Sequence, residues 1–180
     1  MKKIIFVFSV IIVGIIAVGG WFYFQQSTQI EWKMYVNDTH NFQIQYPEAW
    51  VIREDQGDGF FRLDIFYPED IENADIYGNV AVLFTTEGNP EESFNTEYEI
   101  MQRDLTLNIQ ESSIGRLDGF QGVAHEEALG AESIFVHGLY LDRQKQGIFQ
   151  INGWAVELAS GDKKYKTAVQ NIISSIQFPE

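Results

Sequence analysis

The longest apolar stretch of the chain lies at its N-terminus. Ile4–Phe24 contains no charged residue. A helix rises about 1.5 Å per residue, so a helix of this length spans roughly 30 Å, the thickness of the hydrocarbon core of a bilayer. The pattern therefore predicts one transmembrane helix as a membrane anchor within residues 1–24, a polar tether over residues 25–34 and a globular domain over residues 35–180.

The first part of the domain has the hydrophobic pattern of β-strands. Phe42–Tyr46 and Phe61–Ile65 alternate between apolar and polar residues, and Trp50–Ile52 is a short apolar run. The polar segment Arg53–Gly59 is rich in Asp and Gly and is interpreted as a turn. Asn79–Phe84 is almost wholly apolar, which predicts a strand that is buried on both faces.

Two amphipathic helices are predicted, one in the middle of the domain and one at its end. Asn89 can cap the first helix, Pro90 suits its first position, and Glu92 has the spacing of a capping box. Its apolar face is expected to contain Phe94, Tyr98, Met101 and Leu105. Gly161 ends the preceding strand, and Asp162 can cap the second helix. Its apolar stripe consists of Tyr165, Ala168, Val169, Ile172, Ile173 and Ile176.

Between the helices lie four strand-like runs, Leu107–Ile114, Gly119–Glu126, Ser133–Asp142 and Gly147–Ala159. Asp118-Gly119 is a hairpin turn signal between the first two. Links this short require antiparallel pairing, because a parallel crossover needs a dozen or more residues. The order of elements therefore predicts an α+β domain in which the helices pack on an antiparallel β-sheet.

Two stretches of the sequence resemble the PsbP-like domain family. Asn41–Trp50, with the sequence NFQIQYPEAW, is similar to the motif that opens these domains, in which Tyr-Pro and then Trp follow a Phe-x-Ile strand. Tyr165–Ile176 is similar to their closing helix. The resemblance covers roughly residues 35–179. It implies an α/β/α sandwich around an antiparallel sheet, and a non-catalytic protein that serves as an adaptor or assembly factor.

The opening motif also has a physical interpretation. Pro47 lacks an N–H group, so it ends strand pairing and turns the chain. Tyr46 and Trp50 then flank the turn and can cover one end of the core. The alternative is that Tyr46, Pro47 and Trp50 form a surface for a ligand or a partner.

The distribution of charge indicates where the domain lies. The chain has 26 Asp and Glu against 12 Lys and Arg, a formal net charge of −14. Lys2 and Lys3 precede the apolar run, and the first basic residue after it is Lys33. The positive-inside rule therefore predicts a single-pass protein of the cell membrane with a cytoplasmic N-terminus and an extracytoplasmic domain. A signal peptide cleaved after Ala17-Val18-Gly19 is the alternative.

One group of residues has the side chains of a metal site. His125 and His137 lie on neighbouring predicted strands, and a register that places them directly opposite each other would bring Glu127 onto the same face. Such a group can bind a divalent metal or act as a pH-sensitive pair. Two unrelated strand histidines are the alternative.

The sequence lacks the familiar catalytic motifs. A zinc-protease motif would need a second histidine at Leu129, and no G-x-S-x-G elbow is present. The absence of cysteine excludes disulfides. A strongly acidic domain lacks the basic footprint that nucleic acid requires. We therefore expect no enzyme, no cofactor and no nucleic-acid partner.

These observations predict a membrane-anchored extracytoplasmic domain that binds an envelope protein or supports assembly of an envelope complex. The alternative is a module of the cell envelope that binds a small ligand or a divalent metal.

Overall fold

The computed structural model describes residues 30–68, 78–128, 131–144, 146–157 and 164–179. Within these residues, five strands precede the helix α3: β1 (Trp32–Asn37), β2 (Phe42–Pro47), β3 (Val51–Gly57), β4 (Phe60–Phe66) and β5 (Gly78–Thr85). They are followed by α3 (Pro90–Arg103), β6 (Asn108–Ile114), β7 (Leu117–Ala128), β8 (Ala131–Asp142), β9 (Ile148–Glu157) and α4 (Lys164–Ser174). The described residues therefore form the expected α+β fold.

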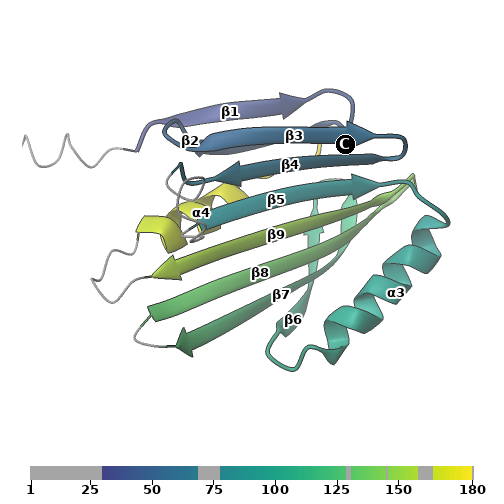
Figure 1. Ribbon diagram of the computed structural model, residues 1–180. Helices are drawn as coiled ribbons and strands as arrows, with labels where there is room; N and C mark the ends of the chain where they lie inside the picture. The colour runs from purple at the N-terminus through teal and green to yellow at the C-terminus, as the bar shows by residue number, and fades with distance from the viewer. Residues whose placement is uncertain (1–29, 69–77, 129–130, 145, 158–163, 180) are drawn as a thin grey trace, which may run out of the picture. The chain divides into compact units, whose positions relative to one another are not determined.

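Seven of the strands form one sheet in the order β3-β4-β5-β9-β8-β7-β6, and β1 and β2 form a separate hairpin. The strands β4, β5, β9, β8 and β7 are seen side by side in Figure 1. Each neighbouring pair is antiparallel, as the short links predict. β5 lies inside the sheet, which agrees with its apolar sequence.

The two helices cover opposite faces of the large sheet. A Cβ atom on Gly153 of β9 would lie 2.5 Å from Cδ1 of Ile173, so α4 packs directly on this strand. A Cβ atom on Gly122 of β7 would lie 2.8 Å from Cε of Met101 in α3. The register through β8 places Gly122 on the same face as Asn152, the neighbour of Gly153 in the chain. Successive residues of a strand point to opposite faces, so each helix has a face of its own.

The main hydrophobic core lies on the α4 face of the sheet. There the strands, α4 and the β1–β2 hairpin bury side chains that include Phe42, Ile44, Leu63, Ile65, Val80, Val82, Ile151, Val169 and Ile172. Each aliphatic side chain buried in this way contributes roughly 1.5–3 kcal/mol relative to exposure. The predicted stripe of the last helix is confirmed for Ala168, Val169 and Ile172, which are buried, whereas Ile176 is buried beyond the end of α4 at Ser174.

The start of α3 is confirmed, whereas its predicted apolar face is too long. The Asn89 side chain accepts a hydrogen bond from the Glu91 backbone N–H at 3.1 Å. The helix ends at Arg103, and Leu105 is 96% exposed beyond it. The carboxylate of Asp104 accepts hydrogen bonds from the N–H and hydroxyl of Thr106, at 3.0 and 2.6 Å. These local bonds compete with further helical turns and explain the early end.

Two turns differ from the sequence prediction. Only Asp58 and Gly59 of the predicted turn Arg53–Gly59 form the turn, because β3 continues to Gly57 and β4 begins at Phe60. β3 is an edge strand, where charged side chains face water at little cost. Asp118-Gly119 lies within β7, so the β6–β7 turn falls at Gly115 and Arg116 instead. Gly115 has a φ of 57°, which the turn requires and glycine adopts readily.

The domain also begins earlier than predicted. β1 starts at Trp32 and pairs with β2 along its whole length, so the expected boundary at residue 35 is three residues late. The predicted anchor over residues 1–24, the acidic segment 69–77 and the helix cap Asp162 lie outside the described residues. Within the described part of the chain, none of the helices has the length and hydrophobicity needed to cross a membrane.

Candidate functional site

The predicted facing pair of histidines is wrong in its register. β7 and β8 pair so that His125 lies opposite Ile134, and His137 lies opposite Gly122. The pairing differs by three residues from the one expected. Because side chains alternate along a strand, an odd displacement moves one histidine to the other face of the sheet. His125 is exposed on the α4 face, whereas His137 is half-buried on the α3 face.

The short β7–β8 link explains this register. Ala128 pairs with Ala131, so two residues form the connection, and loop length determines which residues meet across a hairpin. Glu127 lies opposite Glu132 in the ladder. Within the described residues, no three His, Cys, Asp or Glu side chains come together in a group that could bind a metal.

The predicted aromatic surface at the start of the domain lies largely inside it. Pro47 is buried, Trp50 is 8% exposed and Tyr46 is half-buried. The Trp50 ring meets Tyr67 edge-on at 6.1 Å, and a Cβ atom on Gly78 would lie 2.8 Å from Trp50 Cη2. This burial favours the interpretation of these residues as a cover for one end of the core.

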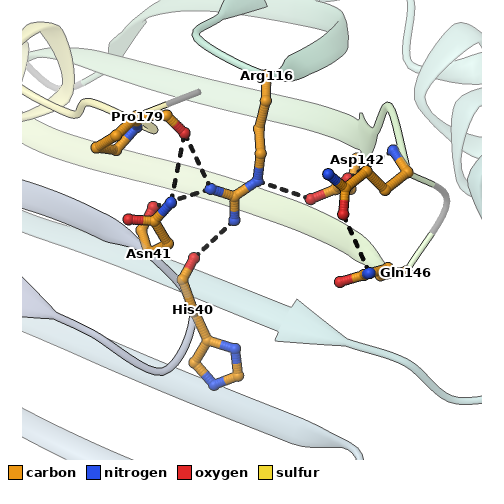
Figure 2. Close-up of polar contacts among 7 residues, drawn as sticks. His40, Asn41, Arg116, Asp142, Gln146 and Pro179 are labelled. Atoms are coloured by element: carbon orange, nitrogen blue, oxygen red, sulfur yellow. Dashed lines mark hydrogen bonds and ion pairs between the residues drawn. The ribbon is translucent and has the colours of Figure 1, made fainter.

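Arg116 holds several distant segments together at the other end of the domain (Figure 2). Its Nε donates to the Asp142 carboxylate at 2.8 Å. Its terminal nitrogens donate to the backbone carbonyls of His40, Asn41 and Pro179 at 2.8, 3.1 and 3.2 Å. The guanidinium therefore joins the β1–β2 turn, the β8–β9 turn and the C-terminal segment.

The position of Arg116 depends on the glycine before it. A Cβ atom on Gly115 would lie 1.8 Å from the Phe178 carbonyl oxygen, so a larger residue cannot occupy this turn without moving the C-terminal segment. Two of the Arg116 contacts span 63 and 76 residues of sequence. No local pattern reveals such contacts, and the sequence therefore did not identify Arg116. Its contacts give it a structural role.

A shallow cleft of about 440 Å³ lies between α3 and the ends of β6, β7 and β8. Its lining includes Phe94, Glu111, Ser113, Asp118, Phe120 and Arg143. Arg143 donates two hydrogen bonds to the Asp118 carboxylate, at 2.8 and 3.0 Å, and Ser113 donates a third at 2.9 Å. These bonds, the Arg143 bonds first, lower the pKa of Asp118 to about 2. The cleft thus combines aromatic walls with a fixed ion pair.

Large aromatic side chains are exposed on the α3 face of the sheet, beside the helix. Phe135 of β8 lies directly opposite Trp154 of β9, which lies opposite Asn79 of β5, which in turn lies opposite Phe66 of β4. Phe135 is 37% exposed and Trp154 is 42% exposed. We call Phe135, Trp154 and Phe66 the aromatic row. It lies on the face opposite the main core.

Polar groups next to the aromatic row are incompletely paired. His137 and Asn152 lie opposite each other, two residues along the strands from Phe135 and Trp154. The Asn152 side-chain oxygen Oδ1 is buried and has no hydrogen-bond partner among the described residues. Burial lowers the pKa of His137, although Glu97 of α3 acts in the opposite direction. An unpaired buried acceptor of this kind costs about 1–3 kcal/mol.

The aromatic row was not identified from the sequence, although part of its signal was present. The run that contains Trp154 was recognised as a strand, and alternation would place Trp154 on the face opposite Ile151 and Ala155. Whether that second face is covered depends on where α3 packs, and this is a tertiary property. Exposed aromatic rings of this kind are enriched at surfaces that contact another protein.

No model of a known protein family matches the chain, and a search of curated proteins finds no match either. The solved structures that are similar to it include the following three. A protein of Bacteroides thetaiotaomicron has 13% identity and a TM-score of 0.43 over 82% of this chain, which spans 48% of that protein. LpqN of Mycobacterium tuberculosis, involved in cell envelope biogenesis, has 10% identity and a TM-score of 0.45, with coverages of 86% and 94%.

The third structure is the Ran-binding protein Mog1p of Saccharomyces cerevisiae, with 12% identity, a TM-score of 0.43 and coverages of 83% and 96%. At these identities and TM-scores, the three structures assign neither a family nor a function to this chain.

Proposed function

We propose that this chain is a membrane-anchored, extracytoplasmic and non-catalytic domain that binds a partner protein of the cell envelope, or supports assembly of an envelope complex, through the aromatic row. The proposed location rests on the uncharged segment Ile4–Phe24 and on Lys2 and Lys3 before it. The proposal involves no cofactor and no nucleic acid.

The observation that carries the proposal is the exposure of Phe135 and Trp154. They are direct cross-strand neighbours, exposed by 37% and 42%, so both rings lie on the same exposed part of the α3 face. Aromatic residues are enriched at the centre of protein interfaces, and Trp is among the residues whose truncation costs most.

We further propose that the domain belongs to the PsbP-like family. Tyr46-Pro47 ends β2 and Trp50 immediately precedes β3, which is the place of these residues in the opening motif. The second stretch of the resemblance, Tyr165–Ile176, overlaps α4. The adaptor role of that family agrees with a partner-binding surface and with the absence of a catalytic motif in the sequence.

Site-specific crosslinking in the native membrane tests the partner-binding proposal. A photo-crosslinking amino acid is placed at Trp154, and a matched variant carries it at Ile100 on α3, which is 53% exposed. We expect a discrete crosslinked protein at position 154 that is lost when Phe135 is changed to Ala, and that is absent at position 100. Equal crosslinking from both positions, or none from position 154, would refute partner binding at the aromatic row.

A second candidate function is binding of a small ligand in the cleft beside α3. Its volume of about 440 Å³ is within the usual range for ligand pockets, and Phe94 and Phe120 supply aromatic walls. A ligand of this cleft should raise the melting temperature of the native protein and should have a smaller effect on Phe120→Ala. The crosslinking experiment does not depend on this result.

A further inference from the structure

A second exposed apolar surface lies on β1, far from the aromatic row in sequence. Trp32, Met34 and Val36 are exposed by 36%, 53% and 55%, and they alternate with Lys33 and Tyr35. Tyr35 points the other way and packs on Phe42 of the core, with ring centroids 5.9 Å apart. The outer face of β1 is thus apolar, whereas its inner face carries Tyr35 together with the polar residues Lys33 and Asn37. We call Trp32, Met34 and Val36 the apolar stripe.

The strand next to the apolar stripe adds no charge to this surface. Val36, Met34 and Trp32 lie directly opposite Gln43, Gln45 and Pro47 of β2. The six residues on this side of the hairpin are uncharged, although the chain carries a formal net charge of −14. A strand with one face in water normally alternates apolar and polar residues, so an uncharged, largely apolar outer face indicates a surface that is covered.

The apolar stripe follows closely after the apolar N-terminal segment. Seven residues, 25–31, separate Phe24 from Trp32, and a fully extended chain of this length reaches about 25 Å at most. If Ile4–Phe24 spans the membrane, β1 cannot lie farther than this from the end of the membrane-spanning segment. The apolar stripe is thus the exposed apolar surface that follows the proposed anchor most closely in the chain. It contains a tryptophan, a residue enriched at membrane interfaces.

We propose that the apolar stripe docks the domain on the surface of the bilayer that holds its N-terminal segment. This inference rests on the membrane anchoring proposed above. Apolar contact drives the docking, because an acidic domain is repelled by anionic lipid. A tether this short gives a high effective concentration, so a contact that is weak by itself is sufficient. Docking would also restrict the orientation of the domain relative to the membrane.

The absence of cysteine allows a direct test with single-cysteine variants of the full chain. Met34→Cys carries an environment-sensitive fluorophore on the apolar stripe, and Leu105→Cys, at a residue that is 96% exposed, is the matched control. Both proteins are reconstituted in phosphatidylcholine vesicles with and without a lipid-borne quencher. We expect a blue-shifted emission and strong quenching of the label at position 34, and neither effect at position 105.

Vesicle flotation in the same samples separates this inference from the anchoring on which it rests. If the chain floats with the vesicles while the two labels respond alike, the bilayer docking is refuted and the anchoring stands. If the chain does not float, both are refuted.

A blue shift at position 34 without quenching by the lipid also refutes docking, because a second copy or another protein then covers the apolar stripe. A second label at Val36→Cys must give the same result as the label at position 34.

Discussion

At the scale of single residues, two arginine–aspartate pairs show how burial changes the contribution of an ion pair to stability. Arg116 and Asp142 have side chains that are 18% and 5% exposed, and Arg143 and Asp118 have side chains that are 50% and 55% exposed. Both pairs have a contact of 2.8 Å. Removing one partner of a buried pair leaves a charge without compensation, whereas an exposed carboxylate is solvated by water.

We therefore predict that Arg116→Met strongly destabilises the domain. The change removes the bond to Asp142 and the bonds to three backbone carbonyls. The expected loss is about 3 kcal/mol of unfolding free energy, at the lower end of the values for broken buried pairs because Arg116 remains partly accessible. Urea denaturation followed by circular dichroism measures the change.

Arg143→Met is the matched control for this prediction. It also removes two hydrogen bonds to an aspartate, but its partner Asp118 is exposed and keeps its hydrogen bond from Ser113. We expect its unfolding midpoint to stay near that of the unmodified protein. Equal losses in the two variants would contradict the structural role of Arg116.

At the scale of elements, the position of α3 creates the candidate binding face. The helix packs through Met101 on Gly122, and Tyr98 stacks on Phe120 at 3.9 Å, so it covers β7 and reaches His137 of β8. Phe135 and Trp154 stay outside this cover. An element that protected the whole face would leave no aromatic row.

The start of α3 provides a prediction at this scale. Asn89→Ala removes the acceptor of the Glu91 N–H and should destabilise the domain by about 1 kcal/mol, the usual cost of losing an N-cap. Asn95→Ala makes the same change at an exposed position inside the helix, where alanine has the higher helix propensity. We expect a lower melting temperature for the first variant and an unchanged or higher one for the second. The reverse order would show that the cap does not stabilise α3.

At the scale of the whole molecule, two histidines make stability depend on pH. Burial lowers the pKa of His137, and burial together with the nearby Arg116 charge lowers the pKa of His40. The His40 ring lies between Phe84 and Phe61, at centroid distances of 4.5 and 4.9 Å. The unfolded chain therefore binds protons below about pH 6.5 more readily than the folded domain does.

We predict that the unfolding free energy falls as the pH decreases below about 6.5, the pKa of histidine in the unfolded chain. The fall continues until the pH reaches the lowered pKa values of His40 and His137 in the folded domain. Above this range both states carry neutral histidines, so the two groups contribute no pH dependence there. Urea denaturation at a series of pH values measures the effect. Only a small further loss is expected between about pH 3.8 and pH 2, because the pKa of Asp118 lies at about 2 in the folded domain but water screens this exposed pair.

Histidine variants separate the first effect from the second. His137→Gln should weaken the dependence of the unfolding free energy on pH near 6.5. If the variants His137→Gln and His40→Gln both keep the full pH dependence of the unmodified protein, the buried histidines are not its cause.

Local chemistry in the sequence was sufficient for much of the fold. Alternation and apolar runs predicted the strands from Phe42 to Glu157, the cap at Asn89 marked the start of α3, and the stripe around Ile172 predicted the buried face of α4. These features depend on neighbours within a few residues, whose spacing determines hydrogen bonding and periodicity. The antiparallel pairing followed as well, because the links are too short for a crossover.

The tertiary structure decided which of these elements and side chains come together. The two-residue β7–β8 link placed His125 and His137 on opposite faces, and a displacement of three residues removed the predicted pair. Trp50 became part of the core, while Trp154 of β9 stayed exposed because α3 does not cover it. Arg116 acquired its role from carbonyl groups that are distant in the chain. Periodicity specifies the faces of each element, but the packing of distant elements determines which face meets water.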